Sequence, residues 1–269
     1  MSANALEHHS VQLNGIKQHY VKTGSGPAVM LLHGWPQTWY EWRRVIRLLE
    51  GKFTVIAPDL RGFGYSSKPA SGYDAATIAA DLAALAAHLG LKDVTVVGHD
   101  WGAVFGYVYA ASHPGEVSAL GIVDMVLPGL GIMEQAISPA PGGNFLWHMG
   151  FQSVPDLPEL LIQGKERPYL QWFYEHFAYD PSAISASDID VYVAAITQAG
   201  ALRAGLAVYQ NYFTIAEQVV AHAKKPLTIP VHAFGGAASL AGLTLTCANA
   251  VAPGAQGGVI ERCGHWAAE

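Results

Sequence analysis

Short apolar segments alternate with helical segments through the first half of the chain, and this alternation restricts the fold more than any other feature. Four continuous apolar runs have the composition of strands buried on both faces of a sheet: residues 28–34, 53–59, 94–100 and 117–124. Segments with helical spacing separate them: residues 38–50, 75–90 and 101–113. Such alternation predicts an α/β fold with a mostly parallel sheet flanked by helices.

The alternation stops near residue 128 and resumes after Pro226. Residues 129–223 are rich in aromatic side chains and helical spacing and contain no clear strand. The pattern then returns with apolar segments at 229–236 and 257–262, separated by a weak helix. We therefore predict an α/β core made of residues 1–128 and 224–269, with a helical cap inserted at 129–223. Because ligands of open α/β sheets bind outside the carboxyl ends of the strands, the insertion would roof a site there.

Composition excludes several classes of protein. The chain is 51% hydrophobic and 13% charged, with a formal net charge of −6, which does not fit a nucleic-acid-binding surface. The N-terminal residues lack a basic region followed by an apolar run, so we expect no secretory signal. The longest span without charged residues, 226–260, is broken by glycine, proline and Asn249, so it predicts no membrane helix. Two cysteines indicate a reduced compartment, and we expect a cytoplasmic protein.

The stretch VVGHDWGAV at residues 96–104 reads as a strand, a sharp turn and a helix. Gly98 and Gly102 flank Asp100 with the spacing of a nucleophile elbow, where a serine usually stands. A carboxylate at that place can attack a saturated carbon that bears a leaving group, such as an epoxide carbon or a carbon–halogen carbon. The product is an ester on the enzyme, which water must then hydrolyse.

Hydrolysis of that ester needs a base and an acid that orients it. His265 follows the last predicted strand and is the candidate base. No Asp or Glu occurs between Glu217 and Glu261, so the loop at 235–242, where an acid could be expected, holds none. Asp124, at the end of its predicted strand, is therefore the candidate acid, and Glu261 is the alternative.

The tetrahedral intermediate of ester hydrolysis needs backbone N–H donors. One should be the N–H of Trp101, directly after the nucleophile. The other should be the N–H of Trp35 in the loop HGWP, because Pro36 has no N–H to give. The two indoles would also line the substrate pocket.

The motifs HGWP, APDLRGFGYSSKP, GHDWGA and CGHW, in this order and spacing, resemble those of the epoxide hydrolases of the α/β-hydrolase superfamily. The chain looks most like their Cif-type branch, with a matching WH pair at Trp147-His148 and GKER at 164–167. The resemblance implies the α/β-hydrolase fold and the placement of the acid at Asp124. It also implies a ring-opening pair of His148 and Tyr209, with Tyr212 as the alternative tyrosine.

The same resemblance implies further expectations. No metal or organic cofactor would be needed, the substrates would be water and a small apolar epoxide, and a homodimer is compatible with the family. Family members normally continue with a final helix beyond the position of Glu269, and the sequence does not decide whether the chain is truncated there. Cap aromatics would form an apolar tunnel: Phe145, Phe151, Trp172, Phe173 and Phe177.

Two other functions fit part of the pattern. A haloalkane dehalogenase would use the same Asp100, His265 and Asp124, but it holds its halide with side-chain N–H donors and often has a polar residue where Trp35 stands. A catalytically silent binding protein of the same fold would bind a ligand without turning it over. Epoxide hydrolysis is the function we predict.

Overall fold

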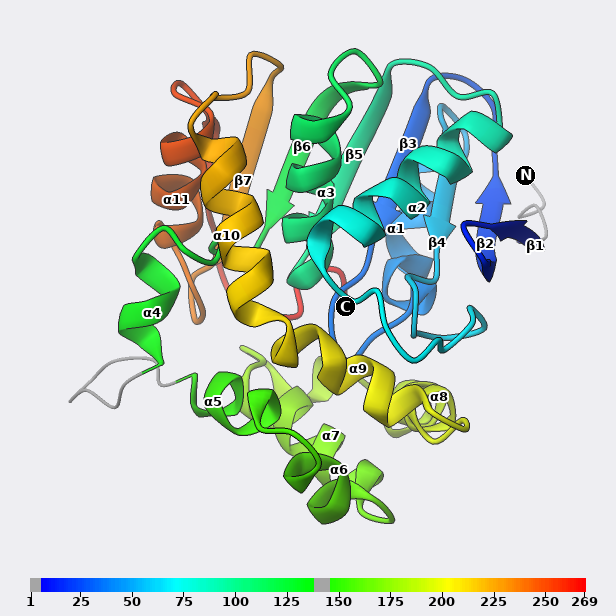
Figure 1. Cartoon of the computed structure of the whole chain (residues 1–269), viewed down its shortest axis with the longest axis vertical. Helices are drawn as coiled ribbons and strands as arrows, with labels where there is room; N and C mark the ends of the chain where they lie inside the picture. Colours follow the sequence, from blue (N-terminus) through cyan, green and yellow to red (C-terminus); the bar gives the residue numbers. More distant parts are fainter. Residues whose placement is uncertain (1–5, 138–145) are drawn as a thin grey trace.

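An eight-stranded sheet forms the centre of the molecule (Figure 1). The computed structural model describes residues 6–137 and 146–269. The strands in chain order are β1 Glu7–Leu13, β2 Ile16–Thr23, β3 Ala28–Leu32, β4 Thr54–Pro58, β5 Val94–His99, β6 Val117–Val123, β7 Val231–Gly236 and β8 Gln256–Ile260. Their order across the sheet is β1-β2-β4-β3-β5-β6-β7-β8.

The pairing confirms the predicted α/β-hydrolase sheet. Strands β3 to β8 run parallel to one another, whereas β2 pairs with both β1 and β4 in the antiparallel sense. Strand β3 lies between β4 and β5. The chain therefore passes from β3 to β4 on one side and later adds β5 on the other side of β3. Folds of this kind bind ligands at the carboxyl ends of the strands where the order reverses.

Alternate residues of the central strands supply two separate apolar cores, as the twofold period of a strand requires. Val29 and Leu31 of β3 pack with Trp42 and Ile46 on one face of the sheet. Their neighbour Met30 belongs to the larger core on the other face. Burial on both faces explains why these strands read as continuous apolar runs rather than as alternating ones.

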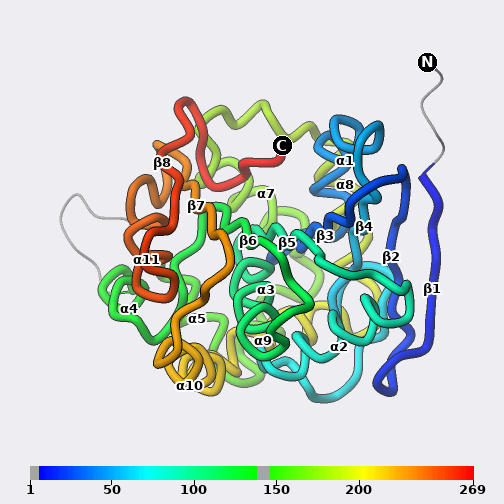
Figure 2. Tube along the Cα trace, turned by 90° about the horizontal axis from the view of Figure 1, so that it is seen from above, coloured from blue at the N-terminus to red at the C-terminus, as the bar shows by residue number. Residues whose placement is uncertain are grey.

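Helices cover both faces of this sheet. The first group accompanies the strands: η1 Trp39–Trp42, α1 Arg43–Leu49, α2 Ala75–His88, α3 Trp101–Ser112 and α11 Leu243–Val251. Helix α1 lies on one face, and α2 and α3 lie on the other (Figure 2). The predicted helices are therefore present, with the first of them starting as a short 3-10 turn at Trp39.

The second group of helices lies between β6 and β7: α4 Ile132–Ala136, α5 Trp147–Ser153, α6 Leu157–Ile162, α7 Glu166–His176, η2 Pro181–Ala183, α8 Ala186–Ile196, α9 Ala201–Gln210 and α10 Tyr212–Ala223. Helices α5 to α9 lie beyond the carboxyl ends of the strands, whereas α10 runs alongside α3 over the sheet (Figure 1). The described part of the insertion is helical, as expected. The division of the chain into a cap of residues 129–223 and a core of the remaining residues stays a prediction.

Two strands end two residues earlier than the sequence predicts. Strand β3 ends at Leu32 rather than at residue 34, because His33 turns into a loop where its Nε2 accepts the Leu60 N–H at 3.0 Å. Strand β8 ends at Ile260, which places Glu261 in the exposed turn that follows.

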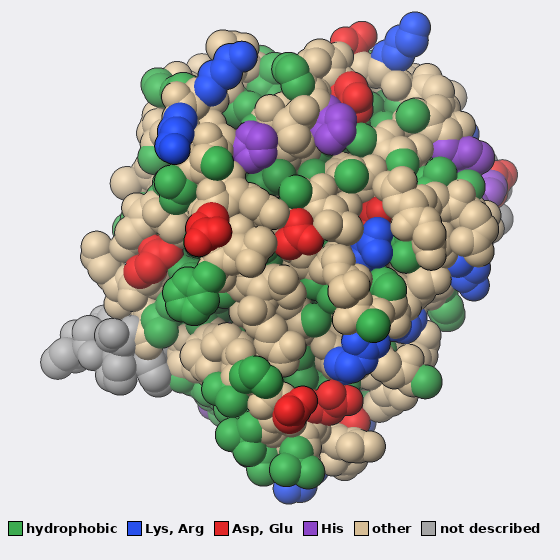
Figure 3. All heavy atoms as spheres, in the orientation of Figure 1, with side chains coloured by type: hydrophobic (Ala, Val, Ile, Leu, Met, Phe, Trp, Pro, Cys, Tyr) green, Lys and Arg blue, Asp and Glu red, His purple; other side chains and the backbone are tan. Residues whose placement is uncertain are grey.

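Among residues 6–137 and 146–269, no single helix is long and apolar enough to cross a membrane. Helices α8 and α9 pass that test only as a pair, which is bent by 84°. Hydrophobic side chains gather at the tip formed by α6 (Figure 3), where Leu157, Leu160 and Leu161 are exposed. The expected homodimer and the expected location in the cytoplasm remain predictions.

A buried ion pair ties the loop after β4 to α2, and we expect its loss to destabilise the fold. Arg61 contacts Asp81 through two hydrogen bonds of 2.7 and 2.8 Å. Removing one partner of a buried pair costs about 3 kcal/mol or more, because the other charge stays buried alone. Asp81→Asn should therefore lower the free energy of unfolding in urea by about 3 kcal/mol.

The matched control is the exposed pair of Arg167 and Asp190, whose side chains are 42% and 64% exposed. Asp190→Asn should cost less than about 1 kcal/mol, because water already screens that pair. Equal losses in the two variants would contradict this assignment.

Candidate active site

The turn at Asp100 is held by close backbone packing on both sides. Asp100 has φ +51° and ψ −132°, a conformation that residues with a side chain rarely adopt. A Cβ atom on Gly98 would lie 2.3 Å from the Gly102 carbonyl oxygen, and one on Gly102 would lie 2.3 Å from that of Leu32. Only glycine fits either position, so the glycine spacing seen in the sequence is a packing requirement of the elbow.

The Asp100 carboxylate meets the loop that follows β3. The backbone N–H of Trp35 donates to Asp100 Oδ1 at 2.8 Å. A Cβ atom on Gly34 would lie 2.3 Å from the same oxygen, so glycine at 34 permits this approach. One carboxylate oxygen is thus held by the predicted N–H donor, and the other faces His265.

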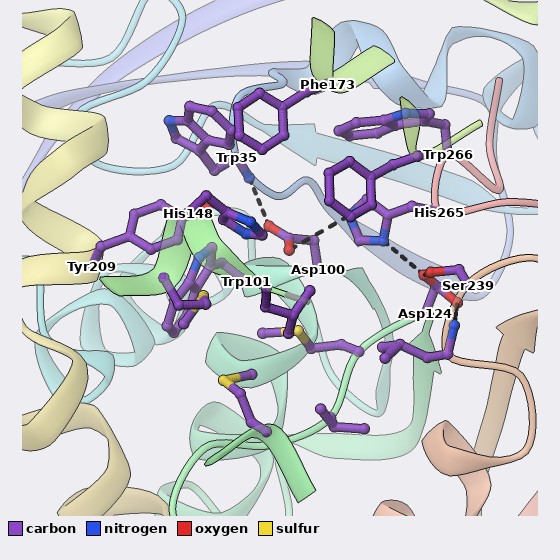
Figure 4. A pocket seen from close by; sticks show the side chains of 17 residues that line it. Trp35, Asp100, Trp101, Asp124, His148, Phe173, Tyr209, Ser239, His265 and Trp266 are labelled. Atoms are coloured by element: carbon purple, nitrogen blue, oxygen red, sulfur yellow. Dashed lines mark hydrogen bonds and ion pairs between the residues drawn. The ribbon is translucent and has the colours of Figure 1, made fainter. Parts of the chain in front are cut away.

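His265 lies between two carboxylates (Figure 4). Its Nε2 is 3.6 Å from Asp100 Oδ2, and its Nδ1 is 2.7 Å from Asp124 Oδ2. The structure therefore brings together the three side chains that the sequence singled out, from the ends of β5, β6 and β8. Glu261, the alternative acid, is exposed in its turn.

Asp124 is held by a loop that sequence reasoning left unexplained. The Gly236 N–H donates to its Oδ1 at 2.7 Å, and the Ser239 hydroxyl donates to its Oδ2 at 2.6 Å. The small residues of 235–242 let backbone and serine donors approach the carboxylate. Ser239 lies in the loop after β7, and no local pattern in the sequence links it to Asp124.

Burial alone would raise the pKa values of Asp100 and Asp124, but their hydrogen bonds, above all with His265, lower both below the ordinary value. Burial alone would likewise lower the pKa of His265. The hydrogen bonds and charges of the two carboxylates outweigh it and raise that pKa above its usual range. The two carboxylates therefore favour the imidazolium form of His265.

The predicted ring-opening residues both face the pocket. Burial lowers the pKa of His148 to about 4 and raises that of Tyr209 well above its ordinary value. Both groups are neutral near pH 7 and retain hydrogens to donate. Tyr212, the alternative tyrosine, lies outside the pocket lining and donates its hydroxyl to Glu134.

The cavity over Asp100 has a volume of about 60 Å³. Among the described residues, no Lys or Arg lines it, and its polar side chains are Asp100, Asp124, His148, Tyr209, Ser239 and His265. The rest of the wall is apolar apart from the indole N–H groups of Trp35, Trp101 and Trp266. It includes three methionines that the sequence did not single out: Met125, Met133 and Met149.

Of the aromatic residues expected to form a tunnel, Phe173 and Phe177 line the cavity. Phe151 and Trp172 pack elsewhere against the core, and Phe145 lies outside the described residues. Within residues 6–137 and 146–269, no cluster of three or more His, Cys, Asp or Glu side chains could hold a metal ion.

The comparisons agree with this geometry. Residues 27–179 match the family described as the alpha/beta hydrolase fold. A soluble epoxide hydrolase from Corynebacterium sp. (strain C12) is 40% identical over 267 residues, covering 98% of this chain and 92% of that protein. The chain belongs to the epoxide hydrolases of the α/β-hydrolase fold.

Solved structures extend the likeness of this epoxide hydrolase. Cfl2 from Burkholderia cenocepacia has a TM-score of 0.94 at 36% identity, covering 99% of this chain and 92% of that one. The Cif epoxide hydrolase from Acinetobacter nosocomialis has a TM-score of 0.93 at 23% identity, covering 99% and 85%. The second likeness supports the shared fold, and Cif proteins are thus among the structural neighbours, as the motifs suggested.

One relative has another activity. A fluoroacetate dehalogenase from Burkholderia sp. is 33% identical over 190 residues, covering 69% of this chain and 60% of that protein. Both activities therefore occur among proteins similar to this epoxide hydrolase. The residues that line the pocket are the evidence that bears on which substrate it accepts.

We expect Asp124→Asn to lower the pKa of His265. The substitution keeps an oxygen that can accept from Nδ1 but removes a negative charge that stabilises the imidazolium. Titration of the ¹⁵N-labelled histidine side chains by NMR would measure this, with His265→Gln to assign the signal. An unchanged titration midpoint would show that Asp124 does not hold the charge of His265.

Proposed function

We propose that this enzyme hydrolyses small apolar epoxides to vicinal diols through a covalent ester on Asp100. The observation that carries the proposal is the placement of His265 between an elbow carboxylate at 3.6 Å and a second carboxylate at 2.7 Å. In this scheme residues 129–223 act as a cap over a core of residues 1–128 and 224–269. The reaction needs water and no cofactor.

The two oxygens of Asp100 have different tasks. Oδ1 accepts the Trp35 N–H at 2.8 Å, so Oδ2, which faces His265, is the oxygen that attacks the less hindered epoxide carbon. As the new C–O bond forms, the ring C–O bond breaks and charge develops on the ring oxygen. Tyr209 and His148 hydrogen-bond that oxygen, and one of them supplies its proton.

Water then completes the reaction. His265, oriented by Asp124, takes a proton from water, and the resulting hydroxide attacks the carbonyl carbon of the ester. The oxyanion forms on Oδ1, and the N–H groups of Trp35 and Trp101 stabilise it. Collapse of the intermediate breaks the ester C–O bond, and the leaving oxygen of the diol takes the proton held by His265. The acid proton that remains on Asp100 passes through solvent to the donor that lost its own in ring opening, which restores both the Asp100 carboxylate and the neutral donor.

The lining of the pocket favours an epoxide over a haloacid. A haloacid carries a carboxylate, which buried sites usually meet with an Arg or Lys side chain. Among the described residues, none of the side chains lining this cavity is Lys or Arg. Haloalkanes lack that charge, so haloalkane dehalogenation is the alternative that requires a direct test.

We expect the wild type to convert styrene oxide to its diol and to release no bromide from bromoalkanes of similar size. His265→Gln should still open the epoxide but should not hydrolyse the ester, because its base is gone. An adduct with the added mass of one styrene oxide should then accumulate on the intact protein.

The other outcomes separate the alternatives. Bromide without diol would identify a haloalkane dehalogenase that uses the same nucleophile. Neither product from the wild type, and no adduct on the variant, would favour a binding protein. Diol formation by His265→Gln at the wild-type rate would remove His265 from the role of base.

Tyr209→Phe should slow ring opening by about 10²-fold, because the epoxide oxygen loses a neutral donor in the transition state. Tyr212→Phe is the matched control, since it removes the same hydroxyl from the next helix, where it donates to Glu134. Rates of adduct formation with His265→Gln as the parent would isolate this step. A larger loss in Tyr212→Phe would assign ring opening to Tyr212 instead.

A further inference from the structure

The main chain of His265 is held from two directions, and the mechanism above uses neither contact. Its N–H donates to the carbonyl oxygen of Phe177, just after α7, at 2.7 Å. Its own carbonyl oxygen lies 2.8 Å from Nε2 of His99, in the core. Because a carbonyl oxygen only accepts, His99 must carry the hydrogen on Nε2. The backbone of His265 is thus hydrogen-bonded on one side to the insertion and on the other side to a residue of β5.

Gly264 lets this segment fit between its neighbours. A Cβ atom on Gly264 would lie 2.4 Å from the Phe177 carbonyl oxygen and 2.5 Å from the Tyr179 nitrogen. On the other side, a Cβ atom on Gly236 would lie 2.1 Å from the Gly264 carbonyl oxygen. These contacts are with backbone atoms, which cannot swing aside as a side chain does. The segment before His265 therefore fits only while residue 264 is glycine.

His99 is itself fixed. Its Nδ1 lies 3.0 Å from Glu41 Oε1, and both side chains are only 1% exposed. This close approach to a buried carboxylate restricts the rotation of the His99 ring. The His99 ring also packs against the His265 ring at 4.6 Å.

We propose that Gly264 and His99 are positioning residues that set His265 for the hydrolytic half of the reaction. This inference rests on the proposed function. Ring opening draws on Asp100, whose oxygen is held separately by Trp35, and on donors from α5 and α9. Water activation depends on where His265 Nε2 lies, and a displacement of about 1 Å can cost about 10²-fold in rate. The contact between the His265 N–H and the Phe177 carbonyl therefore couples the position of His265 to the position of the inserted helices.

The test compares Gly264→Ala with Gly258→Ala. A Cβ atom on Gly258 would meet nothing within 4 Å, so this variant adds the same methyl group to the same part of the chain without a clash. Styrene oxide is mixed with each protein, the reaction is stopped in acid at set times, and intact mass follows the ester. Gly264→Ala should form the ester within about threefold of the wild-type rate and hydrolyse it about 10- to 100-fold more slowly. Gly258→Ala should behave as the wild type.

A second pair of variants addresses the core side of the contact. His99→Met removes the donor to the His265 carbonyl, whereas His99→Gln keeps an N–H near the place of Nε2. The ester should accumulate in His99→Met and much less in His99→Gln. This pair decides the question if Gly264→Ala does not fold.

Hydrolysis at the wild-type rate in both Gly264→Ala and His99→Met would overturn the inference. So would an equal loss of ester formation and ester hydrolysis, since general damage to the site slows both. A wild type that forms neither ester nor diol would instead contradict the proposed function itself. The two failures are therefore distinguishable.

Discussion

The rest of the site depends on the backbone conformation of Asp100. A non-glycine residue at φ +51° carries strain of about 1–3 kcal/mol, and the turn persists because Gly98 and Gly102 allow backbones to pack around it. This turn places the carboxylate between the end of β5 and the start of α3, where its Oδ1 accepts the Trp35 N–H. The two glycines of the motif are therefore required by the packing of the backbone, independently of any reaction.

The charges around His265 suit a reaction in two steps. In the resting protein two carboxylates raise its pKa, and that contribution to stability is full below its ordinary pKa and lost as pH rises through the raised value. Esterification would remove the charge of Asp100 and leave only Asp124. The pKa of His265 would then fall, so the base would become neutral when the ester has formed and water needs activation.

The sequence alone was sufficient to predict elements with a repeating apolar pattern and residues at a turn that requires glycine. Buried strands, the elbow glycines and the end-of-strand position of Asp124 all leave a local pattern, so the amino-acid order alone places their elements. Ser239 and the Phe177 carbonyl leave none, because their partners are far away in the chain and one is a backbone atom. Strand β3 ended early for a similar reason, since the bond from Leu60 to His33 is tertiary.

The pocket leaves selection of the substrate to apolar contact. Its polar side chains belong to the proposed chemistry or, as Ser239 does, hold a residue that takes part in it. A polar substituent on the epoxide would lose hydrogen bonds to water, at a cost of about 1–3 kcal/mol, unless it reached one of the few unpaired donors in the wall, such as the indole N–H of Trp35 or Trp266. An apolar substituent gains about 0.8 kcal/mol for each buried methylene. Flexible methionines such as Met125, Met133 and Met149 can fit several shapes, so discrimination against polarity would exceed discrimination between apolar epoxides.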